Sequence, residues 1–145
     1  NLKDYFIKNY FQPNIQLNLA KSLLSFANTS IDISDGLIAD LEKLINKQKL
    51  SYAIKENAIP ISRNLRKTVL IKKLIKSNLI SMGDDYQILF TASPSKSRII
   101  TSTSKKLGIK ITNIGKITSG SKKSIIINEK GEQIVIKNKG YIHQF

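Results

Sequence analysis

Several residue types that commonly carry protein chemistry are missing or scarce in this chain of 145 residues. It has no cysteine, which excludes a disulfide framework, a cysteine-ligated zinc site and a thiol nucleophile. Its one histidine, His143, lies among aromatic residues near the C-terminus, where a structural role is more common than a catalytic one. No Ser-His-Asp order, phosphate-binding loop or dinucleotide glycine fingerprint is present. The candidate chemistry therefore has to come from other residue types, and we assign no catalytic residue.

Long apolar runs are absent as well. Lys, Asn or Ser interrupts every cluster of Ile and Leu before it reaches the roughly 18–20 residues that span a bilayer. No charged segment followed by an apolar stretch and a cleavage site indicates secretion. We therefore expect a cytoplasmic protein without a membrane partner. The chain starts with Asn1 rather than Met, so we treat it as a piece of a longer protein.

Acidic residues are scarce. There are 10 Asp and Glu against 24 Lys and Arg, and the formal net charge is +14. Such an excess could indicate nucleic-acid binding, because basic side chains neutralise phosphates. The bases are scattered, however, and the densest group alternates with Leu, Val and Ile at helical spacing. We interpret this group as the solvated face of an amphipathic helix, with an anion-binding surface as the alternative. Its members are Arg63, Arg66, Lys67, Lys72, Lys73 and Lys76.

Length and composition, with 41% apolar and 23% charged residues, are typical of one folded domain. Periodicity predicts helices over residues 2–11, 17–27, 37–45, 63–76 and 94–107. It predicts strands over residues 29–33, 50–56, 86–91 and 109–117, and a hairpin of residues 125–127 and 134–136. Residues 86–91 are apolar on nearly both faces and are predicted to form the central strand. The predicted fold class is α/β or α+β, sandwich-like, a mixed sheet with helices packed on it.

Half of the acids fall into two short segments, residues 32–40 and 83–85. In the first, Asp32, Ser34 and Asp35 stand where a predicted strand ends and a helix begins, and Gly36 lets the backbone turn. Carboxylates there can hold Mg²⁺, and the helix N-terminus can offer N–H groups to a phosphate. The alternative is that Ser34 or Asp35 only caps the helix and that Asp40 lies on the surface.

The second segment, Gly83-Asp84-Asp85-Tyr86, also places acids beside a glycine turn, just before a predicted strand. By itself it could simply cap a loop. Two acidic turns at strand ends in one domain favour a shared edge for a metal or ligand.

These segments resemble a known family. The run Asp-x-Ser-Asp-Gly-Leu-x-x-Asp-Leu from Asp32, and the run Gly-acid-Asp-Tyr-x-x-Leu-Phe-Thr from Gly83, occur in the order seen in thiamine-monophosphate kinases. Further matches are residues 59–62, 114–117 and 140–143, so the resemblance covers nearly the whole chain. It implies the C-terminal domain of an enzyme of the aminoimidazole-ribonucleotide synthetase-like superfamily.

The resemblance implies ATP-dependent phosphorylation of thiamine monophosphate to thiamine diphosphate, with Mg²⁺. Residues 1–145 would then be a single domain of a longer kinase, a homodimer, whose N-terminal domain lies outside this chain. That domain supplies most Mg²⁺ ligands and nucleotide contacts in the family, so we expect the isolated chain not to turn over. Another superfamily enzyme with a different acceptor, or a basic nucleic-acid-binding module, are the alternatives.

The resemblance also implies roles for single residues. Asp32 and Asp35 correspond to Mg²⁺ ligands and Ser34 to an ATP contact. Asp84 and Tyr141 correspond to the acid and the aromatic residue that contact the thiamine substrate. The family usually has Glu at the positions of Asp84 and Gln87 and a different tail after Tyr141.

Overall fold

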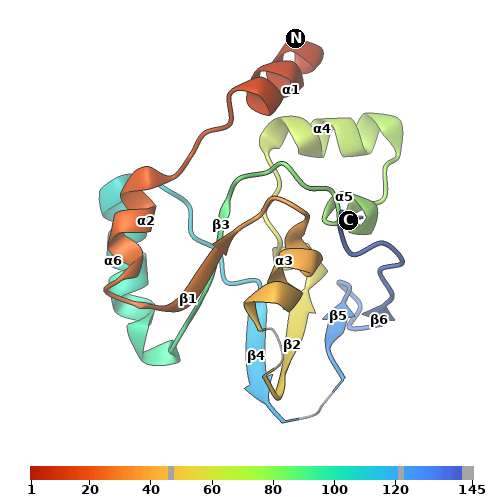
Figure 1. The fold of residues 1–145 in the computed structure, drawn as a ribbon. Coiled ribbons are helices and arrows are strands. Elements are labelled where there is room, and N and C mark those ends of the chain that lie inside the picture. The colour runs from red at the N-terminus through yellow and green to blue at the C-terminus, as the bar shows by residue number, and fades with distance from the viewer. Residues whose placement is uncertain (46–47, 121–122, 142–145) are drawn as a thin grey trace, which may run out of the picture.

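Two β-sheets and the helices around them make up the fold of the computed structural model, which describes residues 1–45, 48–120 and 123–141 (Figure 1). In the smaller sheet, β1 (Ala27–Asp32) pairs antiparallel with β3 (Ile88–Ala92). The larger sheet has the order β4-β2-β5-β6 and is mixed, because β2 runs parallel to β5 and antiparallel to β4. Its strands are β2 (Leu50–Lys55), β4 (Gly115–Ser119), β5 (Ile125–Ile127) and β6 (Gln133–Ile134).

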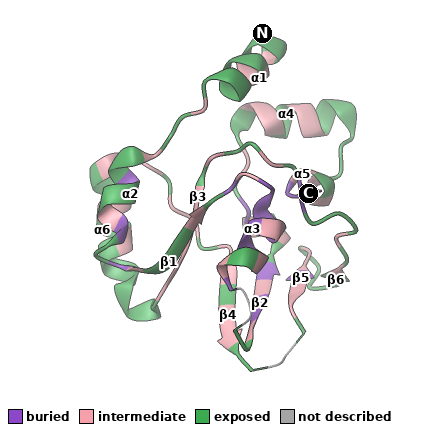
Figure 2. Cartoon of the chain, in the orientation of Figure 1, coloured by how far each residue is buried: buried purple, intermediate pink, exposed green. Residues whose placement is uncertain are grey.

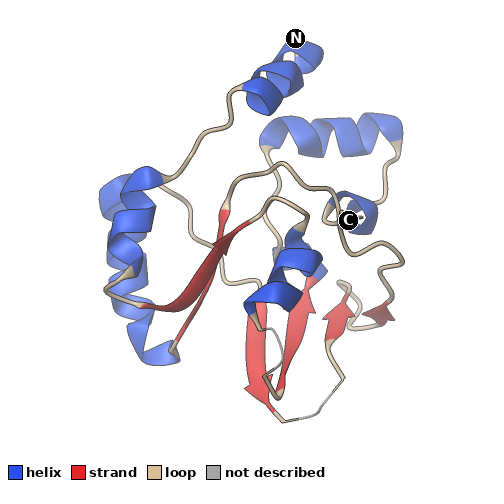
Figure 3. Ribbon diagram, viewed as in Figure 1, coloured by secondary structure: helices blue, strands red, loops and turns tan. Residues whose placement is uncertain are grey.

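Two helices lie beside the smaller sheet and one packs on the larger sheet (Figure 3). The helices are α1 (Leu2–Phe11), α2 (Leu17–Leu23), α3 (Leu37–Leu44), α4 (Arg63–Lys72), α5 (Lys76–Leu79) and α6 (Ser97–Leu107), with short 3-10 turns at Glu56–Ala58 and Pro94–Lys96. The mixed α/β fold class is thereby confirmed. Among the described residues, no helix combines the length and apolar character that a membrane crossing needs.

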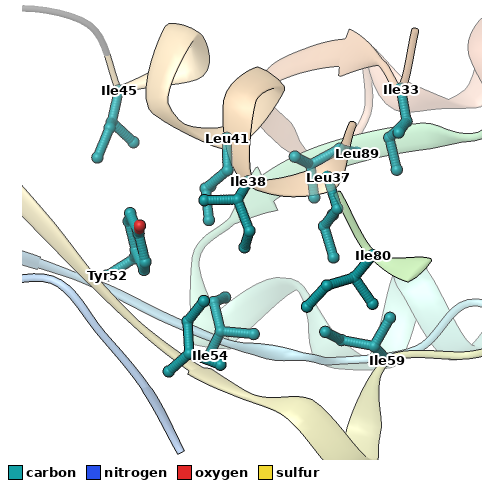
Figure 4. Packing of buried hydrophobic residues seen from close by; sticks show 11 residues of the cluster. Ile33, Leu37, Ile38, Leu41, Ile45, Tyr52, Ile54, Ile59, Ile80 and Leu89 are labelled. Carbon is teal, nitrogen blue, oxygen red and sulfur yellow. The ribbon is translucent and has the colours of Figure 1, made fainter. Parts of the chain in front are cut away.

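The main core lies between α3 and the larger sheet. Ile38 and Leu41 on α3 face Tyr52 and Ile54 on β2, and all four are buried (Figure 4). Burial of one such aliphatic side chain stabilises a fold by about 1.5–3 kcal/mol. Figure 2 shows the buried segments gathered on α3, on the turn before it and on β2. The acidic turn that precedes α3 is therefore built on the main core.

A second hydrophobic cluster lies around α2 and α6. Leu19, Leu23 and Phe26 are buried there, and the Phe26 ring lies 5.3 Å from that of Phe90 on β3. Leu89, the neighbour of Phe90, belongs instead to the main core. Strand β3 thus has one hydrophobic cluster on each face.

The prediction that residues 86–91 form the central strand is wrong. Strand β3 starts at Ile88 and belongs to the two-stranded sheet. Its apolar residues on both faces reflect the two clusters that it separates, and not a strand on each side.

Three further predictions need correction. The predicted helix 63–76 is interrupted, because Lys73 adopts a left-handed conformation with φ of 50° after α4. The predicted helix 17–27 ends at Leu23, and Ala27 already belongs to β1. The predicted strand 109–117 begins only at Gly115, since the segment before it packs into the second cluster as irregular chain. Ser62 caps α4 by accepting a hydrogen bond from the Leu65 N–H, and Gly108 ends α6 with a φ of 63°.

Candidate functional site

The acidic turn between β1 and α3 is organised by the carboxylate of Asp40. Its Oδ2 atom accepts hydrogen bonds from three consecutive backbone N–H groups, those of Ser34 at 2.9 Å, Asp35 at 3.0 Å and Gly36 at 3.2 Å. Asp40 is fully buried. Hydrogen bonds to an ionised group are stronger than neutral ones, so this single side chain fixes the shape of the turn.

The burial of Asp40 excludes one of the alternatives that the sequence left open. Asp40 does not lie on the surface, and the backbone N–H groups of residues 34–36 donate to its carboxylate. Neither Ser34 nor Asp35 caps the helix, because the N-cap residue of α3 is Gly36, which has no side chain to cap it. The spacing could have revealed this, since a helical side chain covers the turn that precedes its own Cα.

Lys43, one turn further along α3, completes the cluster. Its Nζ donates to Asp40 Oδ1 at 2.8 Å and to Asp35 Oδ2. The Lys43 side chain is 49% exposed, whereas that of Asp35 is 11% and that of Asp40 is 1% exposed. The hydrogen bonds to Asp35 and then Asp40 raise the pKa of Lys43, so this side chain is a cation at neutral pH. The sequence analysis missed Lys43, although it lies three residues after Asp40 on one helix face.

The second acidic turn lies directly against the first. The backbone N–H of Asp84 donates to the Ser34 carbonyl at 2.9 Å, and that of Tyr86 donates to the Ile33 carbonyl at 2.8 Å. Gly83 approaches so closely that a Cβ atom there would lie 2.0 Å from the Ser34 carbonyl oxygen. Only glycine permits this approach, and the predicted proximity of the two acidic turns is confirmed.

Asp84 presents its side chain at the surface. Its backbone has a φ of 61°, a left-handed conformation that non-glycine residues seldom adopt. Its Oδ1 atom accepts a hydrogen bond of 3.2 Å from the Tyr86 hydroxyl, and this bond raises the pKa of the Tyr86 phenol. The strained backbone directs an exposed carboxylate beside the first acidic turn.

The C-terminal segment joins the same turn. The N–H of Tyr141 donates to the Asp35 carbonyl at 2.8 Å, and Gly140 packs against that carbonyl and against Ala39. The Tyr141 side chain is 67% exposed. The tail residues 142–145, His143 among them, lie outside the described residues.

A second network, on the far end of α3, holds this segment. Glu42 Oε1 accepts from Lys139 Nζ at 2.8 Å and from the Tyr52 hydroxyl at 3.1 Å. The Lys139 carbonyl accepts from the Ala39 N–H at 3.0 Å. Burial, followed by the charge of Glu42, strongly raises the pKa of Tyr52. Helix α3 therefore positions Tyr141 through side chains and backbone together.

The predicted site residues thus come from three segments that meet at two carbonyls, those of Ser34 and Asp35. Asp32 is exposed at the end of β1, Ser34 is half-buried and Asp35 is buried. Within residues 1–45, 48–120 and 123–141 no three His, Cys, Asp or Glu side chains gather closely enough to hold a metal ion. Mg²⁺ often binds through one or two carboxylates and completes its shell with water and phosphate, so the oxygen donors of Asp32 and Asp35 fit that ion.

Comparison with known proteins finds relatives that match nearly the whole of this chain. The thiamine-monophosphate kinase of Buchnera aphidicola subsp. Schizaphis graminum is 37% identical over 141 residues, which cover 97% of this chain and 43% of the relative. That of Buchnera aphidicola subsp. Acyrthosiphon pisum is 32% identical over 147 residues, 99% of this chain and 44% of the relative. The chain matches the C-terminal domain of thiamine-monophosphate kinases. It spans less than half the length of these relatives.

Solved structures share the fold. Thiamine-monophosphate kinase from Stenotrophomonas maltophilia K279a is 26% identical, with a TM-score of 0.67 over 85% of this chain and 37% of that one. A structure described as AaThiL complexed with AMPPCP and TMP is 22% identical, with a TM-score of 0.74 over 97% of this chain and 42% of that one. No family model matches the chain. The match to thiamine-monophosphate kinases therefore rests on relatives that align with nearly all of this chain and on the shared fold.

Proposed function

We propose that this chain is the C-terminal domain of a longer, homodimeric enzyme that transfers the γ-phosphoryl group of ATP to thiamine monophosphate and forms thiamine diphosphate. The observation that carries this proposal is the 37% identity to a thiamine-monophosphate kinase over 97% of the chain. In this proposal the N-terminal half, which the relatives have in addition, supplies most of the Mg²⁺ ligands and nucleotide contacts. The isolated chain is accordingly inactive.

Asp32 and Asp35 hold Mg²⁺ in this proposal, and Ser34 contacts ATP. Asp40 is unsuited to that role, because its two oxygens already accept from three backbone N–H groups and from Lys43. Bound Mg²⁺ supplies the charge neutralisation that two phosphate-bearing substrates need to approach each other. No general base is required, since the acceptor is itself an anionic phosphate.

Asp84 and Tyr141 contact the acceptor. The carboxylate of Asp84 can face the positively charged thiazolium or the aminopyrimidine, and the Tyr141 ring can stack on one of these rings. Support comes from their placement, because both side chains are exposed and both backbones bond to the acidic turn. This arrangement would bring the acceptor beside the cation-binding residues.

The test is thiamine diphosphate formation from thiamine monophosphate and Mg-ATP by the complete reading frame that contains this chain. We expect product with the wild type and a loss of about 100-fold or more in kcat/KM with Asp32→Asn, because the variant loses a charged metal ligand. The matched control is Asp4→Asn, which removes an exposed carboxylate in the first turn of α1. This control should keep wild-type activity.

A folded, full-length wild type that forms no thiamine diphosphate contradicts the proposed acceptor. Other phosphate-bearing or carboxylate acceptors would then be screened with Mg-ATP. Equal activity of Asp32→Asn and Asp4→Asn would contradict the metal role of Asp32 while leaving the reaction in place.

A further inference from the structure

Lys43 occupies an unusual place for a lysine beside a cation-binding turn. Its ammonium group lies between two carboxylates and donates to one oxygen of each, Asp35 Oδ2 and Asp40 Oδ1. The ammonium therefore holds an oxygen of Asp35 that a divalent cation would need. Two cations cannot share one carboxylate oxygen without strong repulsion at this range.

We propose that Lys43 is an internal competitor for the divalent cation at Asp35, which releases that carboxylate when the cation binds and thereby sets the affinity of the site. The inference rests on the proposed function, because it takes Asp35 as a metal ligand. It assigns a role to a residue outside the metal and substrate sets described above.

Asp40 allows the Lys43 ammonium to be replaced by a divalent cation at Asp35. Its carboxylate is buried and tied to three backbone N–H groups, so it cannot turn toward a cation in the way that a surface carboxylate could. Its second oxygen, at 2.8 Å, continues to pair with Lys43 after Asp35 has left. Lys43 is thus never stranded without a counter-charge, which would be costly for a partly buried ammonium.

The exposure of the two side chains indicates that Lys43, and not Asp35, moves when the pair separates. The Lys43 side chain is about half exposed, and a long half-exposed side chain changes rotamer easily, whereas the chain around Asp35 is held in place. The two acidic turns and the Tyr141 segment fix the backbone of Asp35 through hydrogen bonds to neighbouring carbonyls. Release therefore needs only side-chain rotation.

The experiment measures Mn²⁺ binding to the complete polypeptide by electron paramagnetic resonance. The dissociation constant compared among variants is that of the Mn²⁺ site that disappears in Asp35→Asn. We expect Lys43→Met to lower the dissociation constant of this site about three- to fivefold, the effect of losing a partly exposed ion pair. Lys43→Arg, which keeps the charge, should bind Mn²⁺ more like the wild type than Lys43→Met does. If Lys43→Met does not fold, Lys43→Gln removes the same charge and keeps a polar end.

The chain offers a matched control in Lys139→Met. Lys139 also forms an ion pair of 2.8 Å with a carboxylate of α3, and its side chain is 55% exposed, but its partner is Glu42 and not Asp35. This variant changes the net charge by the same amount and should leave the dissociation constant within about 1.5-fold, since screening weakens remote surface charges. Equal effects of the two variants, or weaker Mn²⁺ binding by Lys43→Met, would overturn the inference.

The outcomes separate this inference from the proposed function. If Lys43→Met tightens the Asp35-dependent site but the wild type forms no thiamine diphosphate, the competitor role stands and the proposed reaction fails. If the wild type forms thiamine diphosphate but no Mn²⁺ site depends on Asp35, the reaction stands and the inference fails.

Discussion

At the scale of single residues, the acidic turn depends on one buried carboxylate that ligates nothing in our proposal. Asp40 satisfies the backbone N–H groups of residues 34–36, which otherwise would be left unpaired in a buried turn. The sequence predicted the turn and the helix that follows it correctly in position. Composition does not distinguish Asp40 from Asp35, because both are acids in the same short motif. The direction of a helical side chain, back over the turn that precedes its own Cα, is the signal that favours Asp40 as the acceptor for this turn.

Replacement of Asp40 should reveal this structural role. Asp40→Asn keeps the volume but removes the charge, and its amide would face either the backbone N–H groups or the Lys43 ammonium, donor against donor. We expect a loss of about 3 kcal/mol in the free energy of unfolding, as for other broken buried ion pairs. Urea unfolding measures this loss. The control is Asp4→Asn at an exposed position, whose free energy of unfolding should stay within about 0.5 kcal/mol of the wild type. A loss for Asp40→Asn as small as that of the control would contradict this role.

At the scale of elements, helix α3 connects every part of the candidate site. Its first turn carries the acidic loop, and Glu42 in its last turn holds Lys139 and the Tyr52 hydroxyl. The apolar period of residues 37–45 was sufficient to predict this helix. The contacts to β2 and to the C-terminal segment were not predictable, because they join residues far apart in the chain that no local pattern connects.

The Tyr52–Glu42 contact should make the free energy of unfolding fall as the pH becomes alkaline. Burial and then Glu42 raise the pKa of Tyr52, so the folded state keeps the phenol proton at a pH where the unfolded chain loses it, near 10. The stabilisation is therefore complete below about pH 9 and falls as the pH rises further. From pH 8 to 10.5, we expect Tyr52 to account for about 0.8 kcal/mol of the loss in free energy of unfolding.

Urea unfolding at these two pH values tests the Tyr52 contribution. Tyr52→Phe should be less stable than wild type at pH 8, since it lacks the hydrogen bond to Glu42, but should lose less stability on going to pH 10.5. Tyr10→Phe, at an exposed position, should keep the wild-type pH dependence. The same pH dependence in all three proteins would show that Tyr52 carries no protonation-linked stability.

At the scale of the whole molecule, strand β3 joins two hydrophobic clusters. The sequence identified residues 86–91 as an apolar strand but not its place in a two-stranded sheet, because a strand between two cores has the same apolar pattern as a strand inside one sheet. Leu89 faces the main core, and Phe90 faces the cluster of α2 and α6. Since neighbouring side chains of one strand belong to different clusters, the two clusters should unfold together.

Leu89→Ala tests this coupling. The variant removes side-chain volume from the main core alone, and we expect it to cost about 2–5 kcal/mol. If β3 couples the clusters, the slow amide exchange of α6 should accelerate as much as that of α3, although α6 contributes to the other cluster. Ile38→Ala, which removes side-chain volume from α3 in the same core, is the matched control and should accelerate both helices equally too. Faster exchange in α3 with unchanged exchange in α6 would mean that the clusters are separate cooperative units, and the acidic turn would then depend on the main core alone.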